Sequence, residues 1–513
     1  MPAKHPFTDY EPVVPPRARR VGGDAALWPE SEVRPGSDET IESAAEPERA
    51  ERTQQLSAAA ASSSLIEPAT EPRVALKRGH LFSYVGLFLF TTVLYFRPYE
   101  LFASLSGFTS IAFWLALLTL LIFLPSQLAL EGTLTARPRE VNLVLLLVVA
   151  ALLSMPFAID PAEAWNEFNA VFLKAVLMFI VLVNVVRTEK RLKGLFWLGL
   201  AISCVLSVGA INDYRLGNFV VQGERIGGLV GGMFGNPNDL ALHLVTMIPL
   251  AFGLFLSTPR LLAKPLYMLC LLLMVGGVIA TFSRGAFLGL AGASLVLAWK
   301  LGRRNRVLMI MLIAGFIIGL LAFAPGEYTS RLGSITAVSS DASSSSRRDV
   351  LFRSIFVALR NPVFGVGMGN FHTVSIRELV SHNAYTQVGA EMGLTAMVIY
   401  IMFIVAPFRR LRLIEHETLA ARRDSRIYYL AVALQASLAA YMISSFFGSV
   451  AYQFNIYYLV GYAVALRRIY EAQTGRELIP APKLASGSSS GGRRAVGDSI
   501  DFPDREGPAT MRM

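Results

Sequence analysis

Two arginines stand where charge is scarce, and their side chains could bind an anion. Arg284 lies in TFSRGAFLGL, between two apolar runs, and Arg225 lies in the glycine-rich segment GERIGGLVGGMFGNPNDLALHL. A guanidinium presents a planar fork of donors that matches phosphate oxygens, and neighbouring glycines allow close approach to the backbone. From the residues alone two interpretations of Arg284 remain open, which are phosphate binding and snorkelling of its head group towards lipid head groups.

His382 could take a proton from a hydroxyl group. It begins HNAYTQVGAEMGLTAM, where a long polar stretch passes into an apolar run. Neutral imidazole accepts protons near pH 7, as a general base requires. Asn383 follows directly, and Glu391 lies about two and a half helical turns further on. A histidine at a helix start can equally be a structural residue, and Glu391 can either support the site or pack helices together.

Other polar residues near these positions have competing explanations. Asn238 has the pattern of a helix start, for which we expect only capping and turn chemistry. Arg215 precedes Arg225 in the same loop and could bind the anion in place of Arg225. Arg347 and Arg348 open a helical pattern, RRDVLFRSIFVALRNP, where either could bind phosphate or belong to a solvated basic face.

Several familiar kinds of site are absent from the sequence. It contains no GxxxxGK[ST] loop for ATP, no HExxH, no G-x-S-x-G elbow and no outward-facing Asp-x-Asp for a metal-bound sugar nucleotide. Its two cysteines, Cys204 and Cys270, both lie in apolar runs, which excludes a disulfide framework. We therefore predict no metal and no cofactor.

Long apolar helices must position these residues. Of 513 residues, 53% are hydrophobic and only 16% are charged, and the mean hydropathy is +0.49. The apolar residues fall in runs of about 17 to 25, long enough to cross a bilayer, so we predict an all-α polytopic membrane protein with about twelve transmembrane helices. The predicted spans are residues 80–96, 103–123, 141–157, 168–186, 194–211, 238–257, 263–281, 286–299, 307–324, 384–406, 427–448 and 451–466.

The distribution of Lys and Arg predicts the orientation of these spans. Basic residues collect in alternate loops, as expected for the cytoplasmic side, and an even number of spans leaves both termini cytoplasmic. Residues 325–383 then form a long extracytoplasmic loop with a short amphipathic helix that could lie on the membrane surface. The net charge of +10 is explained mainly by this topology, so we predict no nucleic-acid partner.

The polar ends of the chain differ from the apolar middle. Residues 1–76 and 471–513 are low in complexity and are predicted to be disordered cytoplasmic tails around a transmembrane domain at 77–470. The N-terminal segment lacks the pattern of a cleaved signal, so we expect the first apolar run to be an uncleaved anchor.

Four segments together resemble the O-antigen ligase and Wzy-type polymerase superfamily of bacterial envelope glycosyltransferases. They are RIGGLVGGMFGNPNDLALHL (225–244), TFSRGAFLGL (281–290), RRDVLFRSIFVALRNPVFGVGMGNF (347–371) and HNAYTQVGAEMGLTAM (382–397). The order of the four segments, and the long loop between the second and the fourth, also match this superfamily. One departure is that the tryptophan usual after the loop arginine is missing from DVLFRSIF.

This resemblance implies an enzyme, a metal-independent inverting glycosyltransferase in the bacterial inner membrane. Its donor would be an undecaprenyl-diphosphate-linked oligosaccharide, and its acceptor a glycan or lipid A-core hydroxyl on the outer side of the membrane. The resemblance assigns catalysis to His382 and Arg284. For substrate binding it implies Arg225, or Arg215 in the same loop, with Arg347 or Arg348 as an addition to the diphosphate clamp. We add Asn383 as a candidate for substrate binding, because it directly follows His382.

Two other classes of function remain as alternatives. A flippase or transporter for the same lipid would show internal repeats and polar residues along several spans, and we find no convincing repeat. A noncatalytic scaffold in an envelope assembly complex has only the long tails in its favour. Ligation and polymerisation use the same donor, and the residues do not separate them.

Overall fold

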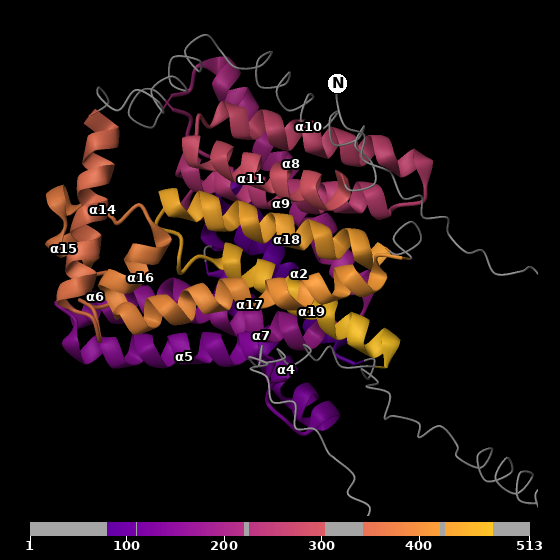
Figure 1. Ribbon diagram of the computed structural model, residues 1–513, viewed down its shortest axis with the longest axis horizontal. Coiled ribbons are helices and arrows are strands. Elements are labelled where there is room, and N and C mark those ends of the chain that lie inside the picture. The colour runs from indigo at the N-terminus through magenta and orange to yellow at the C-terminus, as the bar shows by residue number, and fades with distance from the viewer. Residues whose placement is uncertain (1–78, 109, 220–224, 303–341, 421–425, 476–513) are drawn as a thin grey trace, which may run out of the picture. The chain divides into compact units, whose positions relative to one another are not determined.

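The structure, a computed structural model, describes residues 79–108, 110–219, 225–302, 342–420 and 426–475 (Figure 1). Its elements in these ranges are helices, which confirms the predicted all-α class. The predicted tail at 1–76 lies outside the described residues, as does the C-terminal tail from residue 476. Helix α19 (Phe454–Thr474) continues past residue 471, where that tail was predicted to begin.

Ten helical segments within the described residues are long and apolar enough to cross a membrane. Apolar residues dominate each of them, and a helix satisfies its own backbone hydrogen bonds in lipid. The main helices of these segments are α2 (Leu81–Phe96), α4 (Ile111–Glu131), α5 (Arg139–Ser154), α7 (Leu173–Val185), α8 (Glu189–Leu216), α9 (Pro237–Ser257), α10 (Lys264–Ala280), α11 (Arg284–Gly302), α17 (Leu394–Thr418) and α18 (Arg426–Ser444).

Two of the twelve predicted spans need separate comment. The ninth, 307–324, lies outside the described residues. The twelfth, 451–466, corresponds to α19, in which every 18-residue window contains Arg467, Arg468 and Glu471, whereas each of the ten has an 18-residue window with at most two charged residues. Helix α19 is nevertheless an interior helix, because its tyrosines Tyr457 and Tyr458 are almost completely buried.

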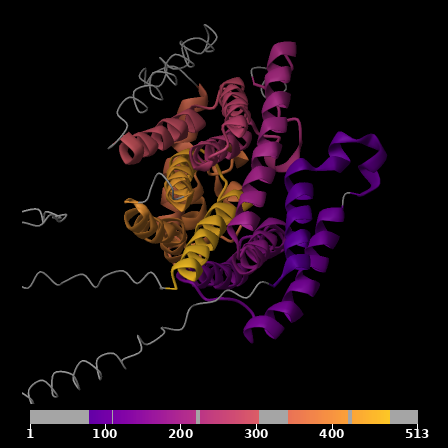
Figure 2. The same ribbon diagram turned by 90° about the vertical axis from the view of Figure 1, so that its right-hand side faces the viewer.

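Helices α9 and α18 form the interior of the bundle. In their apolar windows 89% and 72% of the residues are buried within the protein, against 22% for α4. Figure 2 shows α2 and α4, in indigo, side by side at the edge of the bundle. The segments that carry the predicted site residues therefore start from the ends of well-packed helices.

The predicted tenth span, 384–406, is wrong in its bounds. A short helix, α16 (Ala384–Met392), ends at Gly393, and a new helix, α17, runs from Leu394 to Thr418. Gly393 has a φ of 90°, and a Cβ atom there would lie 2.4 Å from the carbonyl oxygen of Val363. Only glycine fits this turn, so the continuous apolar run contains a sharp break.

The long loop contributes a helical cap at one end of the bundle. Helix α14 (Ala342–Arg360) crosses the direction of the long helices, near α15 (Phe371–Val374) and α6 (Pro161–Glu167) at the left of Figure 1. This confirms the amphipathic helix predicted for the loop. Its apolar side packs on α16 and α15 through a buried cluster of Val350, Val357, Ala358, Val366, Phe371 and Ala390.

Contacts between connections agree with the predicted alternation of sides. The Asp160 amide donates to Asn370 Oδ1 at 2.5 Å, and both residues fall in loops predicted to share one side. Arg187 and Glu131 form an ion pair at 2.6 Å, and both fall in loops predicted for the other side. Loops that the charge pattern groups together are therefore neighbours in space.

Candidate functional site

Arg284 is the first residue of α11 and follows a tight turn. Helix α10 ends at Ala280 with Thr281 as its cap residue, and Phe282 has a left-handed backbone with a φ of 52°. A residue with a side chain pays about 1–2 kcal/mol for this conformation, so the turn must be held by its surroundings. The carbonyl of Ser283 accepts from the Phe287 amide at 3.0 Å and begins the next helix.

Arg225 provides this support. Its Nε and Nη2 atoms donate to the carbonyl oxygen of Thr281 at 3.1 and 2.9 Å, and Nη2 also donates to Asn238 Oδ1 at 3.0 Å. The Ser283 hydroxyl donates to the same Asn238 oxygen at 3.0 Å. Arg225 and Asn238 therefore brace both sides of the turn that presents Arg284.

The expected capping role of Asn238 is wrong. Asn236 caps α9 instead, because its Oδ1 atom accepts from the Asn238 amide at 2.9 Å. A proline at the first helical position, Pro237, favours this start. The Asn238 side chain is thereby free to point at Arg225 and Ser283, a role that the Asn-Pro-Asn pattern did not reveal.

His382 also occupies a strained turn. Its φ is 53°, and its backbone amide donates to Ser449 Oγ at 2.8 Å. Asn383 caps α16, since its Oδ1 accepts from the amides of Tyr385 at 2.9 Å and Thr386 at 3.1 Å. The cap at this helix is thus Asn383, while the His382 side chain is left for another role.

Electrostatic effects connect His382 to two arginines. Burial first, and then the positive charge of Arg347, lower the pKa of His382 below its ordinary value. The pKa of Arg347 is lowered as well, by surrounding protein that displaces solvent and by the charge of Arg284. Arg347 therefore lies close enough to both His382 and Arg284 for their charges to interact, and the imidazole is neutral at neutral pH.

Helix α14 is fastened to α16, which explains why Arg347 lies near His382. The hydroxyl of Ser354 on α14 donates to Thr386 Oγ1 on α16 at 2.8 Å. Arg347 itself remains exposed on the surface of α14. The site is thus open on the side of the cap.

Two predicted residues lie apart from this contact network. Arg348 is exposed on α14 next to Arg347, and Arg215 is exposed in the last turn of α8. Within the described residues, no recorded hydrogen bond or ion pair joins either of them to His382 or to the Arg284 turn. Between Arg215 and Arg225, it is Arg225 that is built into the turn.

The connection between α18 and α19 was missed from the sequence. We call residues 445–453 the α18–α19 connector. A Cβ atom on Gly285 would lie 2.7 Å from Phe447 Cβ, Ser449 accepts from His382, and the Tyr452 hydroxyl donates to Glu391 at 2.7 Å. The apolar runs on both sides left only residues 449 and 450 between two predicted spans, so no loop was visible.

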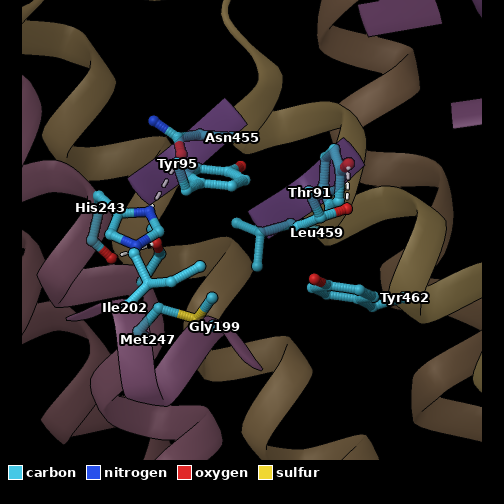
Figure 3. Close-up of a pocket in the computed structure, with 11 residues that line it drawn as sticks. Thr91, Tyr95, Gly199, Ile202, His243, Met247, Asn455, Leu459 and Tyr462 are labelled. Atoms are coloured by element: carbon cyan, nitrogen blue, oxygen red, sulfur yellow. Dashed lines mark hydrogen bonds between the residues drawn. The ribbon is translucent and has the colours of Figure 1, made fainter. Parts of the chain in front are cut away.

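A separate cavity lies inside the bundle and contains none of the predicted site residues. About 10 Å³ of it is accessible to the centre of a water molecule, which is about the space that one water needs. His243 lines it, and its Nδ1 lies 3.2 Å from Asn455 Oδ1 (Figure 3). The other ring nitrogen, Nε2, lies 3.1 Å from Ser203 Oγ. This polar chain ties α8, α9 and α19 together. In the described part of the chain, no three His, Cys, Asp or Glu residues are grouped to hold a metal ion.

Comparison with known proteins gives one match. The O-antigen ligase family model, Wzy_C, matches residues 269–401, which include Arg284, Arg347, Arg348, His382 and Asn383. No curated protein and no solved structure matches the chain. The match thus places residues 269–401 in the O-antigen ligase/Wzy superfamily, as a domain of a chain whose described part has ten helical segments long and apolar enough to cross a membrane.

Proposed function

We propose that the protein transfers a glycan from an undecaprenyl-diphosphate carrier to an acceptor hydroxyl at the outer face of the inner membrane. The observation that carries this proposal is the proximity of Arg284, Arg347 and His382, which come from three segments of the chain, within an O-antigen ligase domain. Two guanidiniums beside one neutral imidazole suit a diphosphate donor and a hydroxyl acceptor.

Arg284 and Arg347 bind the diphosphate in the proposed reaction. Two neighbouring guanidiniums repel each other, and an anion between them offsets that repulsion. As the bond between the sugar C1 and the phosphate oxygen breaks, negative charge grows on the departing diphosphate, which the arginines stabilise through charge-assisted hydrogen bonds. The arginines supply the positive charge, so we propose a metal-independent reaction without a cofactor. Arg348 is a further candidate for this clamp.

His382 accepts the proton of the acceptor hydroxyl as the hydroxyl oxygen attacks C1. The new bond joins this oxygen to C1, and the electron pair of the broken bond leaves with undecaprenyl diphosphate. Attack opposite the leaving group inverts the anomeric centre. Asn383 uses its oxygen for the helix cap, and its buried Nδ2 donor has no partner among the described residues, so it could bind a sugar hydroxyl.

Ligation to lipid A-core and polymerisation of repeat units share this donor and differ in the acceptor. We propose an acceptor of either kind, a glycan or a lipid A-core hydroxyl. The lipid-linked donor requires an enzyme embedded in the inner membrane, and the charge alternation supports cytoplasmic termini.

Transfer in liposomes tests the proposal. Purified protein receives undecaprenyl-diphosphate glycan with each candidate acceptor, in the presence of EDTA, and the product is measured by mass spectrometry. Wild type should transfer, whereas His382→Ala and Arg284→Ala should each lose at least about 100-fold in kcat, the range seen when a general base or a charge-stabilising donor is removed.

A histidine outside the site provides the matched control. His416 is exposed on α17, and His416→Ala should keep wild-type transfer. Transfer that survives both His382→Ala and Arg284→Ala would contradict the catalytic assignment. Movement of the donor lipid across the bilayer without transfer would favour a flippase instead.

A further inference from the structure

The backbone of His382 needs an external constraint. Its φ of 53° lies in the left-handed region, which residues with a side chain avoid. Strained conformations of this kind persist only where the surroundings enforce them, and they gather at active sites. In another backbone conformation the imidazole would point in another direction, so whatever holds this turn also sets the direction of the base.

Ser449 contacts the turn at its strained residue. Its Oγ atom accepts a hydrogen bond from the His382 amide at 2.8 Å, across 67 positions of sequence. The next residue, Asn383, has its own oxygen engaged in capping α16. The turn is therefore held from two sides, by the cap of its own helix and by a hydroxyl group from the α18–α19 connector.

The connector is itself anchored to the rest of the site. Phe447 packs closely against Gly285, the residue after Arg284, and the Ser444 hydroxyl donates to the Gly285 carbonyl at 3.3 Å. On the other side of Ser449, the Tyr452 hydroxyl donates to Glu391 of α16 at 2.7 Å. Ser449 thus has a defined place relative to both Arg284 and α16.

We propose that Ser449 is a positioning residue of the transfer reaction, which holds His382 in its left-handed conformation and so aims the imidazole at the acceptor hydroxyl. This proposal rests on the proposed role of His382 as the general base. It also assigns a function to the α18–α19 connector, which lies outside the matched domain of residues 269–401. Ser449 does not contact the substrate in this proposal, so its loss should slow the chemical step without weakening binding.

A pair of substitutions with equal volume tests the hydrogen bond. Ser449→Thr keeps the hydroxyl, and Ser449→Val replaces it with a methyl group. We expect Ser449→Thr to stay within about 3-fold of wild-type kcat and Ser449→Val to lose about 10- to 100-fold, since small displacements of a catalytic group cost up to about 100-fold. The KM values for donor and acceptor should change by less than about 2-fold in both variants. Ser449→Ala gives the same readout without added volume.

Ser437 provides the control for losing a buried serine. It lies on α18, and its hydroxyl makes no hydrogen bond within the described residues, so Ser437→Ala should keep full activity. Equal kcat for Ser449→Thr and Ser449→Val, with both variants folded in detergent, would overturn the positioning role. That result differs from failure of the proposed function, in which His382→Ala itself stays active. If both Ser449 variants were unfolded, Ser449→Ala would decide, and wild-type kcat in that variant would also overturn the role.

Discussion

Arg225 and Arg284 look alike in the sequence, but their surroundings differ. The Nε and Nη2 atoms of Arg225 donate to the Thr281 carbonyl, and Nη2 also donates to Asn238. Arg225 therefore holds the turn in place. Arg284 begins α11 directly after this turn, and its positive charge lowers the pKa of Arg347. At the scale of single residues, one arginine holds the turn and the other is presented by it.

Removing Arg225 should therefore weaken the fold as well as the reaction. Arg225→Met leaves the Thr281 carbonyl and the Asn238 oxygen without their donor, and we expect a loss of about 1–3 kcal/mol in the free energy of unfolding. Arg225→Lys should restore little, because an ammonium lacks the fork geometry. Thermal unfolding in detergent measures the effect. Arg215→Met is the control, and an equal loss in both variants would argue against the bracing role.

The pH dependence of transfer reports the protonation state of His382. Burial and the charge of Arg347 hold the pKa of His382 below the ordinary value of about 6.5. The imidazole should therefore become protonated, and stop acting as a base, only as the pH falls below that value. Transfer should be flat near pH 7 and decline at lower pH. Arg347→Gln removes a positive charge, so the decline should begin at higher pH. Arg360→Gln, on the exposed end of the same helix, should leave the profile unchanged.

At the scale of elements, the break between α16 and α17 decides where His382 stands. An unbroken helix over 384–406 would continue the direction of α17 into the loop. Instead α16 folds against α14, and the Leu394 amide donates to the Pro362 carbonyl at 2.8 Å across the break. The cap and the bundle meet at this point.

Gly393→Ala should disturb that junction. The new Cβ atom would meet the Val363 carbonyl at 2.4 Å in a left-handed conformation, so we expect destabilisation by more than about 1 kcal/mol and a loss of transfer. Gly107→Ala is the matched control, because nothing lies within 4 Å of its Cβ position. Comparable stability of the two variants would show that the break does not need glycine.

At the scale of the whole molecule, the basic residues serve more than topology. Arg467 on α19 is 8% exposed and lies 3.4 Å from Glu140 on α5, which is 1% exposed. The charge alternation attributed Arg467 to the cytoplasmic side alone. Its buried partner shows that it also ties the last helix to an early one.

Breaking this buried pair should cost more than breaking a surface pair. Glu140→Gln leaves the buried guanidinium of Arg467 with only Glu471, 3.7 Å away on the same helix, as its counter-charge, and the expected loss is up to about 3–5 kcal/mol in the free energy of unfolding. Glu189→Gln removes the half-buried partner of Lys193 within α8, a pair nearer to solvent than Arg467 and Glu140, and should cost at most about 1 kcal/mol. Thermal unfolding compares the two variants, and equal shifts would contradict the buried role.

The proposed orientation can be read from cysteine labelling. In a variant without Cys204 and Cys270, an impermeant maleimide added to spheroplasts should label Gly107→Cys, which in the structure lies between α2 and α4, in the connection whose predicted part, residues 97–102, faces the outer side. It should leave Leu262→Cys unlabelled, because this highly exposed residue lies in a connection predicted for the cytoplasm. The reverse pattern would invert the topology.

The candidate site was predicted in part. Arg284 and His382 stood out because charged or titratable groups are rare beside long apolar runs, whereas Arg347 was one of two alternatives with Arg348. In the structure Arg347 interacts electrostatically with both Arg284 and His382. Ser449 could not be found in this way, because a serine between apolar runs is ordinary. Its contact with His382 depends on how two helical segments pack.

The sequence by itself determined the all-α class, most of the spans and their grouping by side, because apolar length and the placement of Lys and Arg act locally along the chain. Tertiary structure decided which polar groups touch. The role of Arg225 as a brace, the break at Gly393 and the support of His382 by Ser449 all arise from contacts between distant segments. Close packing determines such contacts, and the local pattern of residues does not contain them.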